Sequence, residues 1–193
     1  MPDVRRVAEH LDSSGADLSE YCGLHVHVDA SNLDGRQLTN LLCLAYRYQS
    51  VVTNLLHIHP DRMEYCQPLD EYTANYVARR KPETAWQFNQ YLRTCCTSRY
   101  RTVNFWALSA HDTVEFRWYN ATLNPDLIAA YIDLSVGFVA RACRQQRAST
   151  EPAPFSARTA RENTRQLLSG LGFAGPEYRK TRQVLMERLA HAC

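Results

Sequence analysis

The chain has 193 residues, of which 45% are hydrophobic and 22% are charged, and its net charge at neutral pH is +2. This composition excludes a disordered or fibrous protein, and the small net charge gives no sign of a nucleic-acid partner. The sequence has neither the ~20 consecutive apolar residues of a membrane span nor the apolar stretch of a secretory signal, so we expect a cytoplasmic protein with no membrane partner.

The first half of the sequence predicts one strand and four helices. Apolar periodicity indicates a short helix over Val4–Leu11 and a strand over about Tyr21–Ala30. A long amphipathic helix follows over about residues 36–57, and the proline that comes after it ends helical geometry. The histidines at that end, His57 and His59, are predicted to be surface or capping groups. Two shorter helices are expected over residues 70–80 and 82–95.

Two β-rich runs, Tyr100–Ser109 and Thr113–Tyr119, lie in the second half of the sequence. Only three residues separate them, which is a length suited to a β-hairpin. A helix is then predicted over residues 125–146, with Asn124 as its N-cap and Pro125 as its first residue. Strand and helix signals thus continue to about residue 147.

Composition changes at residues 148–157, where alanine, serine and proline are frequent, and this segment is predicted to be a linker. We therefore expect a main domain over residues 1–147 and a C-terminal helical extension over residues 158–193. The extension is mildly basic, because residues 144–193 hold nine Lys or Arg against four Asp or Glu. Its two amphipathic helices are predicted over roughly Ser156–Ser169, with Gly170 as the stop, and Pro176–Ala192.

Polar side chains alternate with apolar ones on two of the predicted strands. Because successive side chains of a strand point to opposite faces, His25, His27 and Asp29 share one face of the first strand. Glu115 and Arg117 likewise share one face of the later strand. Such groups are costly to bury unless they are paired or hold a metal or an anion, so together they predict a binding site. Taken alone, the histidines are also compatible with satisfied core side chains, and the Glu-x-Arg pair with a structural salt bridge.

Four segments, in this order and spacing, resemble the amidoligase family. Its relatives are glutamine synthetase and the glutamate-cysteine ligases, which are carboxylate-amine ligases. The resemblance covers about residues 15–147 and implies an α+β fold, in which a curved antiparallel sheet carries the site on its concave face and helices back it. The segments are 22–30 (CGLHVHVDA), 60–66 (PDRMEYC), 103–105 (VNF) and 113–124 (TVEFRWYNATLN).

The resemblance implies ATP-dependent joining of a small-molecule or peptide carboxylate to an amine through an acyl-phosphate. It implies that His25 and Glu115 hold a divalent ion, Mg²⁺ or Mn²⁺, and that His27 meets the nucleotide phosphates. Arg117 is implied to face the transferring phosphoryl group, and Arg62 to meet phosphate or substrate. Catalysis of phosphoryl transfer requires mainly that the reactants are positioned and their charge neutralised, which a metal ion and arginines achieve.

Members of this family begin with a strand that carries Gly-x-Glu-x-Glu, followed by a glutamate before a Ser-Pro pair, and these carboxylates complete the metal cage. Residues 1–20 contain no matching pattern. The resemblance therefore leaves three expectations open: these strands lie outside this sequence, a second polypeptide supplies them, or catalysis has been lost. An open sheet edge would in each case invite a second copy or a partner chain.

Three functions follow from these observations. The first is the ATP-dependent ligase, and the second is a catalytically incomplete relative that binds a ligand or a partner. The third is a metal-dependent hydrolase, because His-Val-His-Val-Asp over residues 25–29 also resembles the first metal motif of amidohydrolases. Amidohydrolase barrels usually exceed ~200 residues and need further histidines and aspartates after later strands, whereas the later strand here carries Glu-Phe-Arg.

Overall fold

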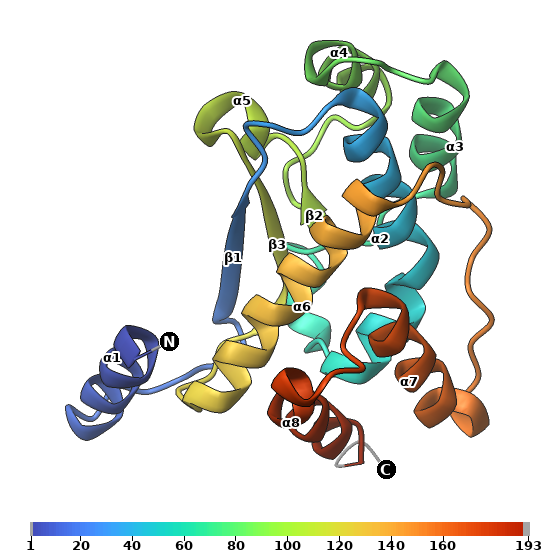
Figure 1. Ribbon diagram of the computed structural model, residues 1–193. Coiled ribbons are helices and arrows are strands. Elements are labelled where there is room, and N and C mark those ends of the chain that lie inside the picture. Colours follow the sequence, from blue (N-terminus) through green and yellow to red (C-terminus); the bar gives the residue numbers. More distant parts are fainter. Residues whose placement is uncertain (1, 191–193) are drawn as a thin grey trace.

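The computed structural model describes residues 2–190, which form eight α-helices and a three-stranded antiparallel sheet (Figure 1). The predicted α+β class is confirmed. The strands are β1 (Gly23–Asp29), β2 (Val103–Asn104) and β3 (Thr113–Asn120). The helices are α1 (Pro2–Ser13), α2 (Gly35–Leu56), α3 (Glu71–Arg80), α4 (Ala85–Cys95), α5 (Ala107–His111), α6 (Pro125–Arg144), α7 (Ala160–Leu171) and α8 (Arg179–Ala190). Short 3-10 turns lie at Pro60–Arg62, Ala157–Thr159 and Pro176–Tyr178.

The sheet has the strand order β1-β3-β2, so β3 is central and β1 lies at an edge. Its register contains a β-bulge, because Leu24 pairs with Tyr119 whereas Val26 pairs with Phe116. His25 of β1 therefore lies opposite two residues of β3, Arg117 and Trp118. Bulges bend a strand and redirect its side chains, and they are frequent beside functional sites.

Helices α2 and α6 pack against each other and against the sheet, as the sequence predicts. Phe116 and Trp118 of β3 are fully buried, and both rings contact Phe138 of α6, with centroids 6.4 and 5.3 Å apart. Tyr119 stacks on Tyr131 of α6 at 4.3 Å. This aromatic packing fixes the core-facing side of the strand whose other side chains form the site described below.

Side-chain caps begin both long helices, and the one at Asn124 is the predicted cap. Asp34 accepts the backbone N–H of Gln37, and the Gln37 side chain accepts the backbone N–H of Asp34, which is a capping box at the start of α2. Helix α2 ends at Leu56 and is capped by His57, which has the left-handed φ of 47°. Asn124 accepts two backbone N–H groups at the start of α6, and Pro125 is the first residue of that helix.

The predicted hairpin before β3 is wrong. Only Val103 and Asn104 pair with β3, and the five-residue helix α5 follows in place of a continued strand. The Asn104 side chain accepts the backbone N–H of Trp106 at 2.9 Å, and the Trp106 indole donates to the carbonyl of Cys96 at 3.1 Å. These two bonds turn the chain away from the sheet, and no local pattern of apolar residues shows them.

Two predicted helix boundaries also differ. Helix α4 begins at Ala85 rather than Pro82, because Thr84 forms a capping box with Gln87. Helix α7 runs through Gly170 and is capped by Gly172, whose φ of 98° is the left-handed conformation that glycine adopts without strain. The predicted end of the last helix at Ala192 lies outside the described residues.

The two C-terminal helices pack on the main body of the fold. Helix α7 contacts α2, and helix α8 contacts α2 and α6 (Figure 1). Leu167, Leu171 and Leu185 are buried in the same hydrophobic core as the residues of α2 and α6. Across residues 2–190, no helix combines the length and the apolar character that crossing a membrane requires.

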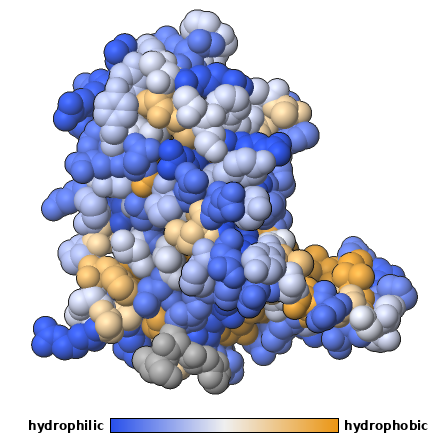
Figure 2. Space-filling model, turned by 180° about the vertical axis from the view of Figure 1, so that it is seen from behind, coloured by the Kyte–Doolittle hydropathy of each residue, from blue (hydrophilic) through white to orange (hydrophobic). Residues whose placement is uncertain are grey.

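Helix α1 packs against α6, and part of the apolar face of α1 stays uncovered. Val7 is 58% exposed and Leu11 is 42% exposed. Together with Leu24, Leu123 and Ile128 they line a hollow of about 420 Å³. Figure 2 shows this apolar patch at its lower right, where α1 lies.

Gly35 provides the first testable prediction. A Cβ atom at this position would lie 2.6 Å from the carbonyl oxygens of Pro82 and Thr84, which belong to the backbone before α4. We expect Gly35→Ala to lower the free energy of unfolding by about 1–3 kcal/mol, because backbone atoms must shift to admit the methyl group. Urea denaturation of the variant measures this loss.

Gly170→Ala is the matched control. Gly170 lies inside helix α7, and a Cβ atom at this position would contact only the end of the flexible Arg141 side chain. Alanine is the better helix former, so this variant should be neutral or slightly more stable than the wild type. Equal stability of the two variants would contradict the close approach at Gly35.

Candidate active site

Strands β1 and β3 bring the predicted polar residues together. His27 lies opposite Glu115 in the register of the two strands, and Asn104 of β2 pairs with Glu115 from the other side. His25 and Arg117 follow two residues away on the same faces of their strands. The predicted proximity of the histidines and the Glu-x-Arg pair is thus confirmed, while their roles stay predictions.

Glu115 is the centre of this cluster and is only 6% exposed. Its Oε1 lies 2.8 Å from Nδ1 of His25 and 2.7 Å from Nη1 of Arg117. Its Oε2 accepts a hydrogen bond of 2.7 Å from the amide of Asn104. Nε2 of His27 lies 3.7 Å from Oε1. Both carboxylate oxygens therefore have protein partners.

The partners of Glu115 keep it ionised. Burial alone would raise the pKa of this carboxyl group, but hydrogen bonds from His25 and Asn104 and the charge of Arg117 lower the pKa to about 2. The carboxylate is consequently negative at every pH at which the protein is expected to work. It holds the surrounding donors in place and does not itself exchange a proton there.

The two histidines differ in their surroundings. Nδ1 of His25 donates to Glu115, so it cannot also accept a hydrogen bond from Arg117, and in the neutral ring Nε2 carries the lone pair. Nδ1 of His27 lies 2.9 Å from Oγ1 of Thr113, and its ring meets the ring of His111 edge-on at 6.0 Å. Both imidazoles therefore have one fixed nitrogen and one that can face a ligand.

Arg117 is held on three sides. Nη1 bonds Glu115, Nε donates to the carbonyl of Tyr65 at 3.2 Å, and Cζ lies 5.6 Å from the ring centroid of Tyr100. Its side chain is 11% exposed. The guanidinium group is therefore oriented before any ligand arrives, which is favourable for recognising an anion.

Arg62 does not join this cluster. It is 2% exposed, and its guanidinium group donates to the carbonyls of Tyr119 and Arg117 at 2.5 and 3.0 Å and to Oδ1 of Asn120 at 3.2 Å. Burial lowers its pKa, although a guanidinium group remains charged at neutral pH. The structure places Arg62 behind the bulge of β3, where it fixes the strand that carries Glu115.

A hollow of about 400 Å³ opens beside Glu115 and Arg117. This is within the usual size of a small-molecule site. Sequence reasoning missed Trp106 and His111, since they come from the segment that was predicted as strand and hairpin, and it missed Arg99, which immediately precedes that segment. Asn104 lies in a segment that carries the family resemblance, but the resemblance gave it no role. The lining residues are His27, Arg99, Asn104, Trp106, Ala107, Ala110, His111, Glu115 and Arg117.

The donor set at the cluster is not a preformed metal cage, because Nδ1 of His25 donates to Glu115 and the opposite ring nitrogen, Nε2, points away from that carboxylate. His25 and Glu115 would hold a divalent ion together only after this hydrogen bond is exchanged, and the one carboxylate already accepts three hydrogen bonds. Mg²⁺ in nucleotide sites is commonly held by one or two carboxylates, water and substrate phosphates, so a single carboxylate is sufficient there. Imidazole ligands favour Mn²⁺ over Mg²⁺.

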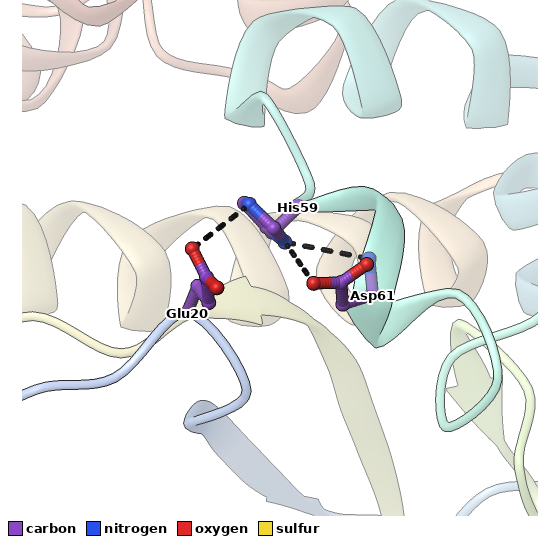
Figure 3. A group of neighbouring side chains, drawn as sticks. All are labelled: Glu20, His59 and Asp61. Carbon is purple, nitrogen blue, oxygen red and sulfur yellow. Dashed lines mark hydrogen bonds and ion pairs between the residues drawn. The ribbon is translucent and has the colours of Figure 1, made fainter.

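A second group of ligand-type side chains lies where the loop before β1 meets the end of α2 (Figure 3). Oε2 of Glu20 lies 3.5 Å from Nε2 of His59, and Oδ2 of Asp61 lies 3.7 Å from Nδ1 of the same ring. The two acids approach different ring nitrogens, which point in different directions, so the arrangement is not a metal cage. Nδ1 of His59 also accepts the backbone N–H of Asp61, which confirms the predicted capping role.

Comparison with known proteins gives one result. A family model described as "putative amidoligase enzyme" matches residues 1–139, which include β1, β3 and all the residues of the cluster. No curated protein and no solved structure gives a significant match. The family description suggests an enzyme of the ligase class. Because the match covers more than half of the chain and contains the whole cluster, the protein belongs to this amidoligase family.

Proposed function

We propose that this protein is an ATP-dependent carboxylate-amine ligase that forms an amide bond through an acyl-phosphate. Its substrates would be small-molecule or peptide carboxylates and amines. One observation carries the proposal: His25, His27, Glu115 and Arg117 meet in one cluster beside a hollow, within the segment that the family model matches.

The reaction has two steps. A carboxylate oxygen of the acid attacks the γ-phosphorus of ATP, and ADP leaves with the electron pair of the broken P–O bond. The amine nitrogen then attacks the acyl carbon, loses a proton, and displaces inorganic phosphate. Both steps build or move negative charge on phosphate oxygens, so fixed positive groups and N–H donors lower their barriers.

The cluster supplies such groups. Arg117 would contact the transferring phosphoryl group through the donor atoms that Glu115 and Tyr65 leave available. His27 lines the hollow and would meet the nucleotide phosphates. Glu115 and His25 would hold Mg²⁺ or Mn²⁺ once the hydrogen bond between them is exchanged, and the bound ion would neutralise phosphate charge. Arg62 would act by positioning the strand, because its guanidinium group is occupied by backbone carbonyls.

The test uses the purified full chain with ATP and either MgCl₂ or MnCl₂. We expect calorimetry to detect nucleotide binding, and Arg117→Ala to weaken it by about 10-fold or more, because a charge-assisted contact is lost. A coupled assay should show ADP release that depends on both a carboxylate and an amine from a mixed panel. The exposed Glu83→Gln variant should behave as the wild type.

One observation favours a second function, a catalytically incomplete relative that binds a ligand or a partner. The cluster has a single carboxylate, and both its oxygens are already engaged. Nucleotide binding without ADP release would support this alternative, and the absence of nucleotide binding with either metal would overturn the ligase proposal. The hydrolase alternative gains no support, because the described strands form one open three-stranded sheet and not a barrel.

The edge of β1 provides a prediction about partners. Within the described chain β1 pairs only with β3, and the apolar patch of α1 lies beside it. Open strand edges pair readily with other chains, so we propose that a second copy or a partner chain covers this edge. Light scattering at micromolar concentration should give a mass above that of the 22.2 kDa monomer. A monomeric mass, unchanged by Val7→Glu, would contradict self-association.

A further inference from the structure

The hollow carries a positive charge that the ligase proposal does not use. Three charged side chains line it, and two of them, Glu115 and Arg117, neutralise each other at 2.7 Å. The third is Arg99, which is exposed and, within the described residues, has no carboxylate within 4.0 Å. The hollow therefore has one uncompensated guanidinium group on its wall.

Arg99 is oriented by the tyrosine that follows it. Its Nη2 donates to the hydroxyl of Tyr100 at 3.2 Å, and its Cζ lies 5.1 Å from the ring centroid of Tyr100. The same ring lies 5.6 Å from Cζ of Arg117 and is contacted edge-on by Tyr65 at 6.0 Å. Tyr100 therefore contacts both guanidinium groups of the hollow, and such cation–π contacts restrict their orientation.

The wall next to Arg99 is rigid and aromatic. Trp106 is fixed by its bond to the carbonyl of Cys96 and by the guanidinium group of Arg93, whose Cζ lies 4.2 Å from the indole ring. A site with an aromatic wall and a few convergent polar groups is suited to a small ligand. The charged group that has no partner determines the charge of the ligand that binds, and here that group is the guanidinium cation of Arg99.

We propose that Arg99 is the anion-binding residue of this hollow, that it binds a carboxylate or phosphate oxyanion through its guanidinium fork, and that Tyr100 positions it. Guanidinium groups match the planar, bidentate geometry of both oxyanions. The assignment of that oxyanion to a substrate rests on the proposed function, because the acid and the nucleotide each bring one. Binding of the oxyanion itself does not depend on turnover.

The experiment compares the wild type with Arg99→Gln, Arg99→Lys and the control Arg158→Gln, which removes an exposed arginine on the turn before α7. Calorimetry uses two probes, inorganic pyrophosphate and succinate. We expect Arg99→Gln to weaken the recognised probe by about 10- to 100-fold, and Arg99→Lys to recover part of the loss. An effect on pyrophosphate alone identifies a phosphate ligand, and an effect on succinate alone identifies a carboxylate.

Tyr100 is tested by a readout that a purely structural role would not change. Tyr100→Phe keeps the ring and removes the hydroxyl bond, whereas Tyr100→Ala removes both contacts. We expect the phenylalanine variant to lose less affinity than the alanine variant, with unchanged far-UV circular dichroism in each. If both variants bind as the wild type does, the positioning role is overturned.

Two outcomes overturn the role of Arg99. One is that Arg99→Gln binds both probes as tightly as the wild type. The other is that the wild type binds neither probe up to ~10 mM, because such an affinity is lower than a single charged contact should give. The ligase proposal is judged separately by ADP release. If Arg99→Gln still ligates with an unchanged KM, the ligase proposal stands and the role of Arg99 is overturned. If probe binding depends on Arg99 but no ligation is detected, the role of Arg99 stands and the ligase proposal is overturned.

Discussion

Glu115→Gln should reduce ADP release in the coupled assay by about 100-fold or more, which is the size of effect expected when a preorganised electrostatic group is lost. Three donors face this side chain: Nδ1 of His25, Nη1 of Arg117 and the amide of Asn104. A glutamine has one acceptor oxygen and one NH₂ group, so at least one donor would face another donor. With the NH₂ group in place of Oε1, His25 and Arg117 would lose their acceptor together, and with it in place of Oε2, Asn104 would lose its acceptor; in both cases the negative charge that faces Arg117 is lost.

Glu83→Gln is the control for this substitution, because Glu83 is exposed and lies outside the hollow. It should retain wild-type nucleotide affinity and ADP release. If Glu115→Gln also retained wild-type turnover, the cluster would not be the site of the reaction.

The same substitution should change how stability depends on pH. The pKa of Glu115 is about 2 in the folded protein, below the ordinary value of 4.5. A lowered pKa means that the ionised group stabilises the folded state above pH ~4.5, and that this stabilisation is lost as the pH falls towards 2. The contribution is on the order of 3 kcal/mol, at 1.36 kcal/mol for each pH unit.

Urea denaturation at pH 7, 5, 4 and 3 measures this contribution. The wild type should be more stable than Glu115→Gln at pH 7, and the difference should shrink at pH 4 and 3. A difference that stays constant from pH 7 to pH 3 would mean that the carboxyl group titrates alike in the folded and unfolded chain.

Arg62→Ala should lower the free energy of unfolding by about 3–5 kcal/mol, because it leaves buried acceptors without a donor and opens a cavity. The guanidinium group donates hydrogen bonds to the carbonyls of Arg117 and Tyr119 and to the side chain of Asn120. Asn120 in turn donates to the carbonyl of His57 at 2.7 Å, which ties the end of α2 to β3. The loss should therefore be accompanied by faster amide exchange in β3.

Gly23→Ala tests the same contact from the other side. A Cβ atom at Gly23 would overlap Nη2 and Cζ of Arg62, so this variant should also be less stable than the wild type. Arg79→Ala, at an exposed position of α3, is the control and should change stability by less than about 0.5 kcal/mol. An Arg62→Ala variant as stable as this control would contradict the bracing role.

Much of the fold could be predicted because its signals are local. Helices α2 and α6 show this: the capping residues Asp34 and Asn124 and the apolar periodicity each involve residues only a few positions apart in the sequence. The proximity of β1 and β3 followed from alternating polar residues combined with the resemblance. The helix α5 could not be predicted, because the turn into it depends on the bond from the Trp106 indole to the carbonyl of Cys96 in the preceding segment, and because the local bond from Trp106 N–H to the Asn104 side chain leaves no mark in the apolar pattern.

The sequence by itself determined which residues form the long helices α2 and α6 and the strands β1 and β3, and which polar side chains share a strand face, since periodicity and capping act over a few residues. Only the tertiary structure decided that Arg62 braces the backbone while Arg99 lines the hollow. A guanidinium group has the same sequence signature whether it binds a carbonyl or an anion. Its role is set by burial and by the partners that distant segments bring within hydrogen-bond distance.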